Sequence, residues 1–244
     1  MKKTVLITGA SRGIGRAMAQ VFARNNYNVI INYLKSEREA LTLEQEIKQQ
    51  ECGAAVYRAD VTQRAQVVAM IAEGEKMFGS IDVLINNAGI SQFKLFTEIS
   101  DADWELMLAT HLKGMFNCCQ GVLPQMIHRK KGKIINIASI WGMVGASCEV
   151  HYSTAKAGMI GFTKALAKEL GPSGIQVNCI APGIIDTEMN KGLGEAETNQ
   201  LREEIPLLRF GKPEEIANLA FYLASPEADF ITGQVISPNG GFVI

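Results

Sequence analysis

The sequence predicts a doubly wound α/β fold, in which helices cover both faces of a mainly parallel, seven-stranded sheet. Short β-rich runs alternate with longer helical stretches along all 244 residues, an order that produces right-handed crossovers and parallel strands. Runs such as Val5-Leu6-Ile7 and Val83-Leu84-Ile85 are apolar at every position, as expected for strands buried on both faces. The expected strands occupy residues 4–8, 28–33, 54–59, 81–86, 133–139, 175–181 and 234–237.

The composition is typical of a single globular domain. No linker, repeat or charge block divides residues 1–244, and this length is common for one α/β domain. The formal net charge of −1 lacks the basic surplus that nucleic-acid binding requires. No apolar stretch reaches the roughly 18 residues of a membrane-spanning helix. We therefore expect one domain that binds neither nucleic acid nor membrane.

The N-terminus and the cysteines indicate a cytoplasmic protein. The apolar run after Met1-Lys2-Lys3 stops at Thr8-Gly9, which is too early for a signal peptide. The five cysteines are odd in number and form no CxxC or Cys/His pairing. We expect reduced, mostly buried thiols and no metal site.

A glycine-rich turn follows the first strand and opens a helical stretch. Gly9, Gly13 and Gly15 stand in a GxxxGxG spacing, one residue longer in the first gap than the usual fingerprint of the Rossmann-type fold. Glycines allow the backbone to approach a pyrophosphate, and the helix N-terminus offers it free N–H groups. The candidate cofactor ligands in this turn are Gly9, Ser11, Arg12, Gly13, Ile14 and Gly15.

The end of the second strand favours NADP over NAD. An NAD-specific site places Asp or Glu here against the ribose 2′-hydroxyl, whereas this chain has Asn32, followed by Lys35 and Ser36. Arg12, Lys35 and the Ser36 hydroxyl would hold a 2′-phosphate through charge and hydrogen bonds. The alternatives are a solvated loop charge for Lys35 and a helix N-cap for Ser36.

Two later strand ends are expected to line the same crevice, because ligands bind beyond the carboxyl ends of parallel strands. Asp60 follows the third strand, where a carboxylate would accept a hydrogen bond from an adenine amino group. Residues 86–89 follow the fourth strand. The alternatives are a helix cap at Asp60 and a simple Asn/Gly turn at 86–89.

Three residues in the second half of the chain indicate proton transfer to a substrate oxygen. Ser139 ends the fifth expected strand, and Tyr152 and Lys156 stand four residues apart, on one face of a helix. The ammonium is expected to lower the pKa of the phenol from its usual value of about 10. Ser139 would hydrogen-bond the oxygen as charge develops on it. A Tyr-x-x-x-Lys pair alone is common in helices, so its weight depends on the other motifs.

Taken together, the motifs resemble those of the short-chain dehydrogenase/reductase family over almost the whole chain. They stand in the family's order: Thr8-Gly9-Ala10-Ser11-Arg12-Gly13-Ile14-Gly15, Asn86-Asn87-Ala88-Gly89, Ser139, Tyr152-Ser153-Thr154-Ala155-Lys156 and Pro182-Gly183-Ile184-Ile185-Asp186-Thr187. The resemblance implies an enzyme in which Tyr152 is the proton donor and Lys156 also binds the nicotinamide ribose. It further implies cofactor contacts at Asp60, Val61, Asn87, Ala88, Gly89, Pro182, Gly183, Ile185 and Thr187.

His111 departs from the family's pattern. The family usually has Asn there, which bends a helix and holds a water that supplies protons to the Lys. An imidazole can hold a water through a ring nitrogen and titrates near neutral pH. We include His111 among the catalytic candidates, with a helix histidine satisfied by the backbone as the alternative.

Two narrower resemblances compete over the substrate. Residues 155–158, 161–164 and 231–234 resemble bacterial 3-oxoacyl-acyl-carrier-protein reductases, enzymes of fatty acid biosynthesis that use NADPH. The basic group 128–131 would meet an acidic carrier protein, or it simply complements a helix dipole. Residues 141–142 and 145–150, with His111, resemble the reductases of a 5-aminopentanone modification on elongation factor P. In that case Glu149 would pair with the substrate's amine.

Three further expectations complete the analysis. A nicotinamide-binding sensor without turnover is the alternative from another functional class, and the residues do not fix the direction of reaction.

The resemblance implies a homotetramer built through the apolar helical stretches 104–129 and 152–170 and the C-terminal residues 241–244. Residues 186–206, rich in Glu, Gly and Asn, are expected to form a mobile lid over the substrate.

Overall fold

Seven parallel strands form one sheet in the order β3-β2-β1-β4-β5-β6-β7. The computed structural model describes residues 2–188 and 194–244. The order reverses beside β1, as in doubly wound folds, so the predicted fold class is confirmed. The strands are β1 (Thr4–Ile7), β2 (Asn28–Tyr33), β3 (Ala54–Arg58), β4 (Val83–Asn86), β5 (Gly132–Ile137), β6 (Ile175–Ile180) and β7 (Val235–Ile236).

The central strands are buried on both faces, as their continuous apolar runs predicted. Val5 and Ile7 of β1 pack into one hydrophobic cluster, and Leu6 between them packs into another on the opposite face. Neighbouring strands repeat this alternation, for example Leu84 between Val83 and Ile85. Two apolar layers therefore fix the register of the sheet between the helices.

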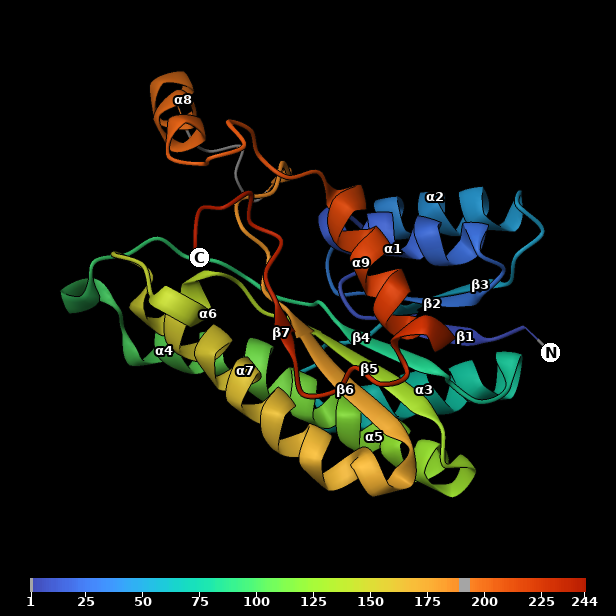
Figure 1. Cartoon of the computed structure of the whole chain (residues 1–244). Coiled ribbons are helices and arrows are strands. Elements are labelled where there is room, and N and C mark those ends of the chain that lie inside the picture. Colours follow the sequence, from blue (N-terminus) through green and yellow to red (C-terminus); the bar gives the residue numbers. More distant parts are fainter. Residues whose placement is uncertain (1, 189–193) are drawn as a thin grey trace.

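Helices cover the two faces in separate layers (Figure 1). The first layer contains α1, α2 and α9 and covers the face of the sheet that carries Val5 and Ile7. The second contains α3, α5 and α7. The helices are α1 (Gly13–Arg24), α2 (Glu37–Lys48), α3 (Arg64–Phe78), α4 (Asp101–Leu108), α5 (Gly114–Arg129), α6 (Trp141–Val144), α7 (Val150–Leu170), α8 (Glu195–Glu203) and α9 (Pro213–Ala224), with short 3₁₀ turns at Phe96–Glu98, Gly171–Ser173 and Pro226–Ala228.

Three central strands end one or two residues before the predicted ends, and these residues shape the crevice beyond the sheet. Thr8 follows β1, and its hydroxyl accepts hydrogen bonds of 2.9 Å from the backbone N–H groups of Asn87 and Ala88. Ser139 similarly follows the end of β5 at Ile137. These side chains add hydrogen bonds at the carboxyl edge, where the N–H groups of Thr8 and Ala138 still bond to the neighbouring strands.

The helical stretch expected at residues 104–129 is interrupted near its start. Between α4 and α5, residues Ala109–Lys113 form a π-helical turn that contains His111. Such turns insert a residue into the helix and occur often at functional sites. Among the described residues, no helix is both long and apolar enough to cross a membrane.

Candidate active site

Ser139, Tyr152 and Lys156 come together at the carboxyl edge of the sheet. All three are buried. The Lys156 ammonium donates a 2.8 Å hydrogen bond to the carbonyl of Ile137 at the end of β5. The nitrogen lies 5.4 Å from the centroid of the Tyr152 ring. The helical spacing predicted this proximity of Tyr152 and Lys156, and the fold adds Ser139 to them.

Glycine at position 142 allows the two helices of this region to approach. After β5 the chain turns into α6, where Ser139 accepts a 3.2 Å bond from the N–H of Trp141. A Cβ at Gly142 would lie 2.6 Å from the carbonyl carbon of Lys156, closer than packed atoms come. The absence of a side chain at Gly142 therefore lets α6 pack directly against the face of α7 that carries Lys156.

The pKa of Tyr152 is raised, which corrects the expectation that Lys156 would lower it. Burial is the main cause, the negative charge of Glu149 adds to it, and a hydrogen bond with Ser139 opposes it. Burial also lowers the pKa of Lys156, to about 8. Desolvation disfavours the charged form of either group. In the protein alone, Tyr152 is consequently a protonated donor at neutral pH.

His111 faces Tyr152 from the π-helical turn. Its ring lies edge-on to the phenol, with centroids 5.5 Å apart, and Nε2 lies 2.8 Å from the carbonyl oxygen of Ile90. The N–H of Ile90 also lies 3.3 Å from Nε2, but the shorter contact with the carbonyl favours the proton on Nε2, which leaves Nδ1 as an acceptor. Burial first, and the charge of Lys156 second, lower the pKa of His111 to about 3. The imidazole is therefore neutral at physiological pH.

The second nitrogen of His111 remains available. Nδ1 is buried and has no hydrogen-bond partner among the described residues. Gly89 makes room for the ring, because a Cβ there would lie 3.1 Å from Nδ1. The backbone thus satisfies one ring nitrogen, as the structural alternative expected. The other can accept a hydrogen bond from a water or substrate group.

The glycine turn has a fixed backbone conformation and leads into a helix whose N-terminus is uncapped. Gly9 has φ +62°, and a Cβ there would lie 2.9 Å from the Cα of Ala88. The Asn87 amide donates to the carbonyls of Thr8 (2.9 Å) and Gly9 (3.1 Å), which ties the turn to the end of β4. Within the described chain, no side chain caps the N-terminus of α1, and its first turn holds no acidic residue. These features fit the pyrophosphate of a dinucleotide.

Asn32, one of the predicted cofactor ligands, supports this turn. Its side-chain oxygen accepts a bond of 3.2 Å from the N–H of Gly9, and its amide nitrogen donates over 2.9 Å to the carbonyl of Ala59. The side chain is buried. These two hydrogen bonds of the Asn32 side chain link β2 to the glycine turn and to the end of β3.

The expected 2′-phosphate ligands lie on the surface beside the turn. Arg12 forms an exposed ion pair with Glu188, with 3.4 Å between nitrogen and oxygen, and Lys35 is exposed. Ser36 occupies the N-cap position of α2, as its alternative role expected, but its hydroxyl makes no capping bond there. Sequence reasoning missed Glu37, whose carboxylate accepts a 2.7 Å bond from the Tyr33 hydroxyl.

The remaining cofactor candidates also surround the crevice. Asp60 accepts a 2.9 Å bond from the N–H of Thr62, which forms a local turn ahead of α3, whereas the N-cap of that helix is Gln63. The carbonyl of Val61 accepts from Asn117. On the other side, Thr187 approaches the glycine turn, since a Cβ on Gly13 would lie 3.6 Å from its methyl group. The loop at 182–187 is fixed by bonds from Ile140 to Pro182 and from Gly183 to Pro238.

Three other expectations can be located. The basic group 128–131 lies at the end of α5, at the amino edge of the sheet and opposite to Tyr152, and Arg129 pairs there with Asp82 at 2.9 Å. Helix α8 lies at the carboxyl edge (Figure 1), within the expected lid, while residues 189–193 of that lid lie outside the described residues. The described residues contain no group of three potential metal ligands.

Comparison with known proteins covers nearly the whole chain. A family model described as "Enoyl-(Acyl carrier protein) reductase" matches residues 9–243. The 3-oxoacyl-[acyl-carrier-protein] reductase FabG of Staphylococcus epidermidis is 44% identical over 241 residues, which is 99% of both chains. The chain belongs to the short-chain dehydrogenase/reductase family. The proteins of the same name from Staphylococcus aureus (44% identical, 98% of that protein) and Chlamydia trachomatis (42% identical, 97% of that protein) also match 99% of this chain.

Membership of the short-chain dehydrogenase/reductase family makes the protein an NAD(P)-dependent oxidoreductase. It confirms the predicted family and the use of a nicotinamide cofactor. Sequence reasoning did not identify the buried contacts around His111 or the support given by Asn32, because both depend on segments far apart in the chain. The glycine turn and the Tyr-x-x-x-Lys pair could be recognised from the sequence, because each motif lies within one short segment of the chain.

Proposed function

We propose that this protein uses NADPH to reduce the ketone of a 3-oxoacyl group on acyl carrier protein to a secondary alcohol. The observation that carries the proposal is the convergence of Ser139, Tyr152 and Lys156 beside the glycine turn. The similarity to 3-oxoacyl-[acyl-carrier-protein] reductases over 99% of the chain supports the substrate class. The same residues argue against a sensor without turnover.

In the proposed reaction, the chain's own residues position the ketone and supply a proton. Ser139 donates a hydrogen bond to the ketone oxygen as negative charge develops on it. Tyr152 retains its proton at neutral pH because its pKa is raised, and transfers it to that oxygen. The reduced nicotinamide supplies the hydride when bound. Lys156 binds the nicotinamide ribose, and its ammonium stabilises the phenolate that remains.

Proton supply to Lys156 is proposed for His111. Its buried, unpartnered Nδ1 would accept a hydrogen bond from a water placed between the ring and the Lys156 ammonium. Because the low pKa keeps the imidazole neutral, His111 would orient this water rather than carry the proton itself.

The activity is tested by mixing the protein with NADPH and an acetoacetyl thioester and following the loss of reduced-nicotinamide absorbance. Turnover is expected with the wild type and should fall by about a hundredfold or more in Tyr152→Phe, with NADPH affinity retained. NADPH binding without turnover of any activated ketone would favour the sensor. An unimpaired Tyr152→Phe variant would contradict the assignment of the proton donor.

A second candidate substrate is an amine-bearing ketone, such as the 5-aminopentanone modification of elongation factor P. The observation that favours it is Glu149, whose carboxylate is partly buried and has no hydrogen-bond or ion-pair partner in the part of the chain that the structure describes. Burial raises its pKa, and its charge acts on Tyr152. An ammonium on the substrate would compensate this charge.

The two candidates are separated by Glu149→Gln. If the substrate carries an amine, the variant should lose far more activity on an aminoketone than on a neutral ketone of similar size. Equal losses on both ketones would remove the aminoketone proposal. The ratio of the two kcat/KM values is the relevant measurement, because it cancels general effects of the substitution on Tyr152.

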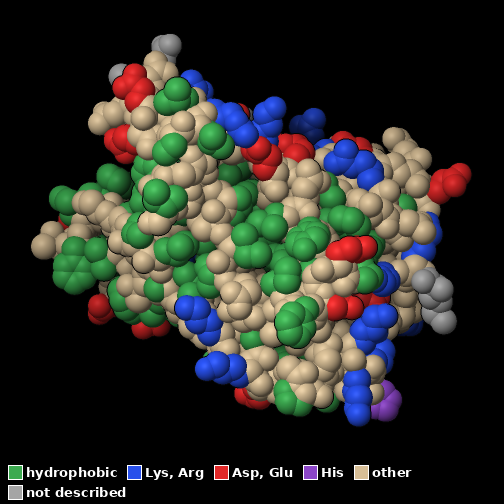
Figure 2. All heavy atoms as spheres, viewed as in Figure 1, with side chains coloured by type: hydrophobic (Ala, Val, Ile, Leu, Met, Phe, Trp, Pro, Cys, Tyr) green, Lys and Arg blue, Asp and Glu red, His purple; other side chains and the backbone are tan. Residues whose placement is uncertain are grey.

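We further propose that the protein is a cytoplasmic homotetramer. The helical stretch expected at its interfaces exposes Leu106, Phe116 and Ile127, each by 40–57%. Figure 2 shows many hydrophobic side chains on the surface of the end that carries α4 and α6. Burying such side chains between subunits is favourable. Light scattering after size-exclusion chromatography should give four times the chain mass of 26.6 kDa, and a monomer would contradict the proposal.

A further inference from the structure

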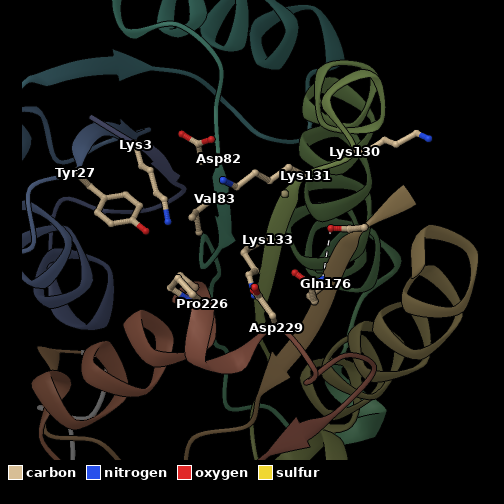
Figure 3. Close-up of a pocket in the computed structure, with 13 residues that line it drawn as sticks. Lys3, Tyr27, Asp82, Val83, Lys130, Lys131, Lys133, Gln176, Pro226 and Asp229 are labelled. Carbon is tan, nitrogen blue, oxygen red and sulfur yellow. Dashed lines mark hydrogen bonds and ion pairs between the residues drawn. The ribbon is translucent and has the colours of Figure 1, made fainter. Parts of the chain in front are cut away.

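A cavity lies at the amino edge of the sheet, at the opposite end from Tyr152. Its volume is about 310 Å³. Residues that directly precede central strands line it: Lys3 before β1, Asp82 before β4 and Lys131 before β5, as Figure 3 shows, and Gly174 before β6. The proposed reaction uses none of these residues.

Each carboxylate that lines the cavity already has a cationic partner. Asp82 pairs with Arg129 at 2.9 Å and also accepts a 2.9 Å bond from the N–H of Thr4. Asp229 pairs with Lys133 at 2.7 Å. The negative charges of the lining are therefore compensated locally.

The cavity retains an excess of positive charge. Within residues 2–188 and 194–244, neither Lys3 nor Lys131 forms an ion pair, although Lys3 contributes to a lowered pKa at Glu227 outside the lining. Figure 3 shows the side chains of Lys3 and Lys131 extending into the space between Asp82 and Tyr27, whereas Lys130 points away. Two ammonium groups are thus available to one ligand.

Tyr27 adds a neutral donor to the same space. Its ring is 6% exposed, the Lys3 nitrogen lies 5.8 Å from its centroid, and its hydroxyl faces the cavity (Figure 3). That hydroxyl has no hydrogen-bond partner among the described residues. Burial and the charge of Asp82 raise the pKa of Tyr27 to about 12, so the phenol remains protonated at physiological pH and able to donate.

We propose that this cavity binds a small phosphate-bearing polyanion at a site separate from the dinucleotide crevice. Two flexible ammonium groups and a phenol O–H are all donors, and the multiply charged phosphate group accepts several such bonds. The cavity volume of about 310 Å³ limits the ligand to a small molecule. The site does not depend on which ketone the enzyme reduces.

The test measures pyrophosphate binding calorimetrically to protein saturated with NADPH, so that the glycine turn is filled. Wild type is compared with Lys3→Gln/Lys131→Gln and with a control, Lys76→Gln/Lys168→Gln, which removes the same charge from exposed lysines on α3 and α7. All measurements use the same ionic strength. Because every variant has the same glycine turn, binding there contributes equally even if NADPH is not the preferred cofactor.

Saturable binding is expected in the wild type and the control, with at least a tenfold loss of affinity in Lys3→Gln/Lys131→Gln. Tyr27→Phe should cause a smaller loss, because it removes one neutral hydrogen bond and leaves both charges. Equal affinities in the wild type and the Lys3/Lys131 variant would overturn the proposal. So would the absence of saturable binding in the wild type.

Discussion

The ammonium nitrogen of Lys156 lies 5.4 Å from the ring centroid of Tyr152, and both side chains are buried. Burial acts on the two groups in opposite directions on the pH scale: it raises the pKa of the phenol and lowers that of the ammonium to about 8. Both shifts favour the uncharged form of the group. Alkaline solution should therefore remove the charge of Lys156 before it ionises Tyr152.

The rate of ketone reduction should consequently fall as the pH rises through about 8. The cause is loss of the ammonium that binds the ribose and stabilises the phenolate. The measurement is kcat/KM against pH at saturating NADPH. Lys156→Arg, which stays charged throughout this range, should be slower but lack this decline. A wild-type profile that stays flat up to pH 10 would contradict the role of the ammonium.

His111 should make the protein less stable in acid. Its pKa is about 3 in the folded chain and near 6.5 when unfolded, so between these values the unfolded state binds more protons and stability falls as the pH falls. At pH 4.5 the loss relative to pH 7 is about 2.5 kcal/mol by this linkage. Urea unfolding at both pH values should show a smaller loss in His111→Asn.

Only the pH dependence is compared in that experiment, because the substitution also changes packing. The buried His151 is present in both proteins, and its lowered pKa contributes equally. An identical loss of stability between pH 7 and 4.5 in wild type and His111→Asn would show that His111 is not held neutral by the fold.

Arg12 and Lys35 should determine the preference for NADPH. Replacing both with Gln removes the two cations expected at the 2′-phosphate, and each charge-assisted bond contributes roughly 1.5–3 kcal/mol. The KM for NADPH should rise by about tenfold or more, with little change for NADH. The control is Arg16→Gln on α1, the helix that follows Arg12. The charge of Arg16 pairs with Glu46. Parallel changes for both cofactors would argue against a 2′-phosphate site here.

Gln92 should fix the segment that precedes Tyr152. Its side-chain oxygen lies 2.9 Å from Nε2 of the buried His151, and its amide donates over 2.8 Å to Asp103. Asp103 also pairs with Lys94 at 2.7 Å. Gln92→Leu would leave the His151 donor without a partner, at a cost of about 1–3 kcal/mol in unfolding free energy. Ser91→Ala on the same loop should change stability by much less.

The sequence predicted most of the fold because its evidence is local. Each central strand is an apolar run, and such runs are stable only between two layers of helices. The parallel sheet and the crossovers followed from the alternation of strands and helices, whereas the strand order comes from the tertiary structure. Some boundaries did not follow, because the polar residues Thr8 and Ser139, expected as strand ends, lie beyond the strands and accept bonds from backbone N–H groups there.

For the candidate site, the sequence by itself determined which groups are present: the glycine turn, Ser139, and the helical spacing of Tyr152 and Lys156. Tertiary structure decided their chemical state. It buried Tyr152 and so reversed the expected direction of its pKa, and it placed Asn32 behind the glycine turn. It also gathered Lys3, Tyr27 and Lys131 around one cavity. Burial and convergence depend on contacts between distant segments, which no local pattern encodes.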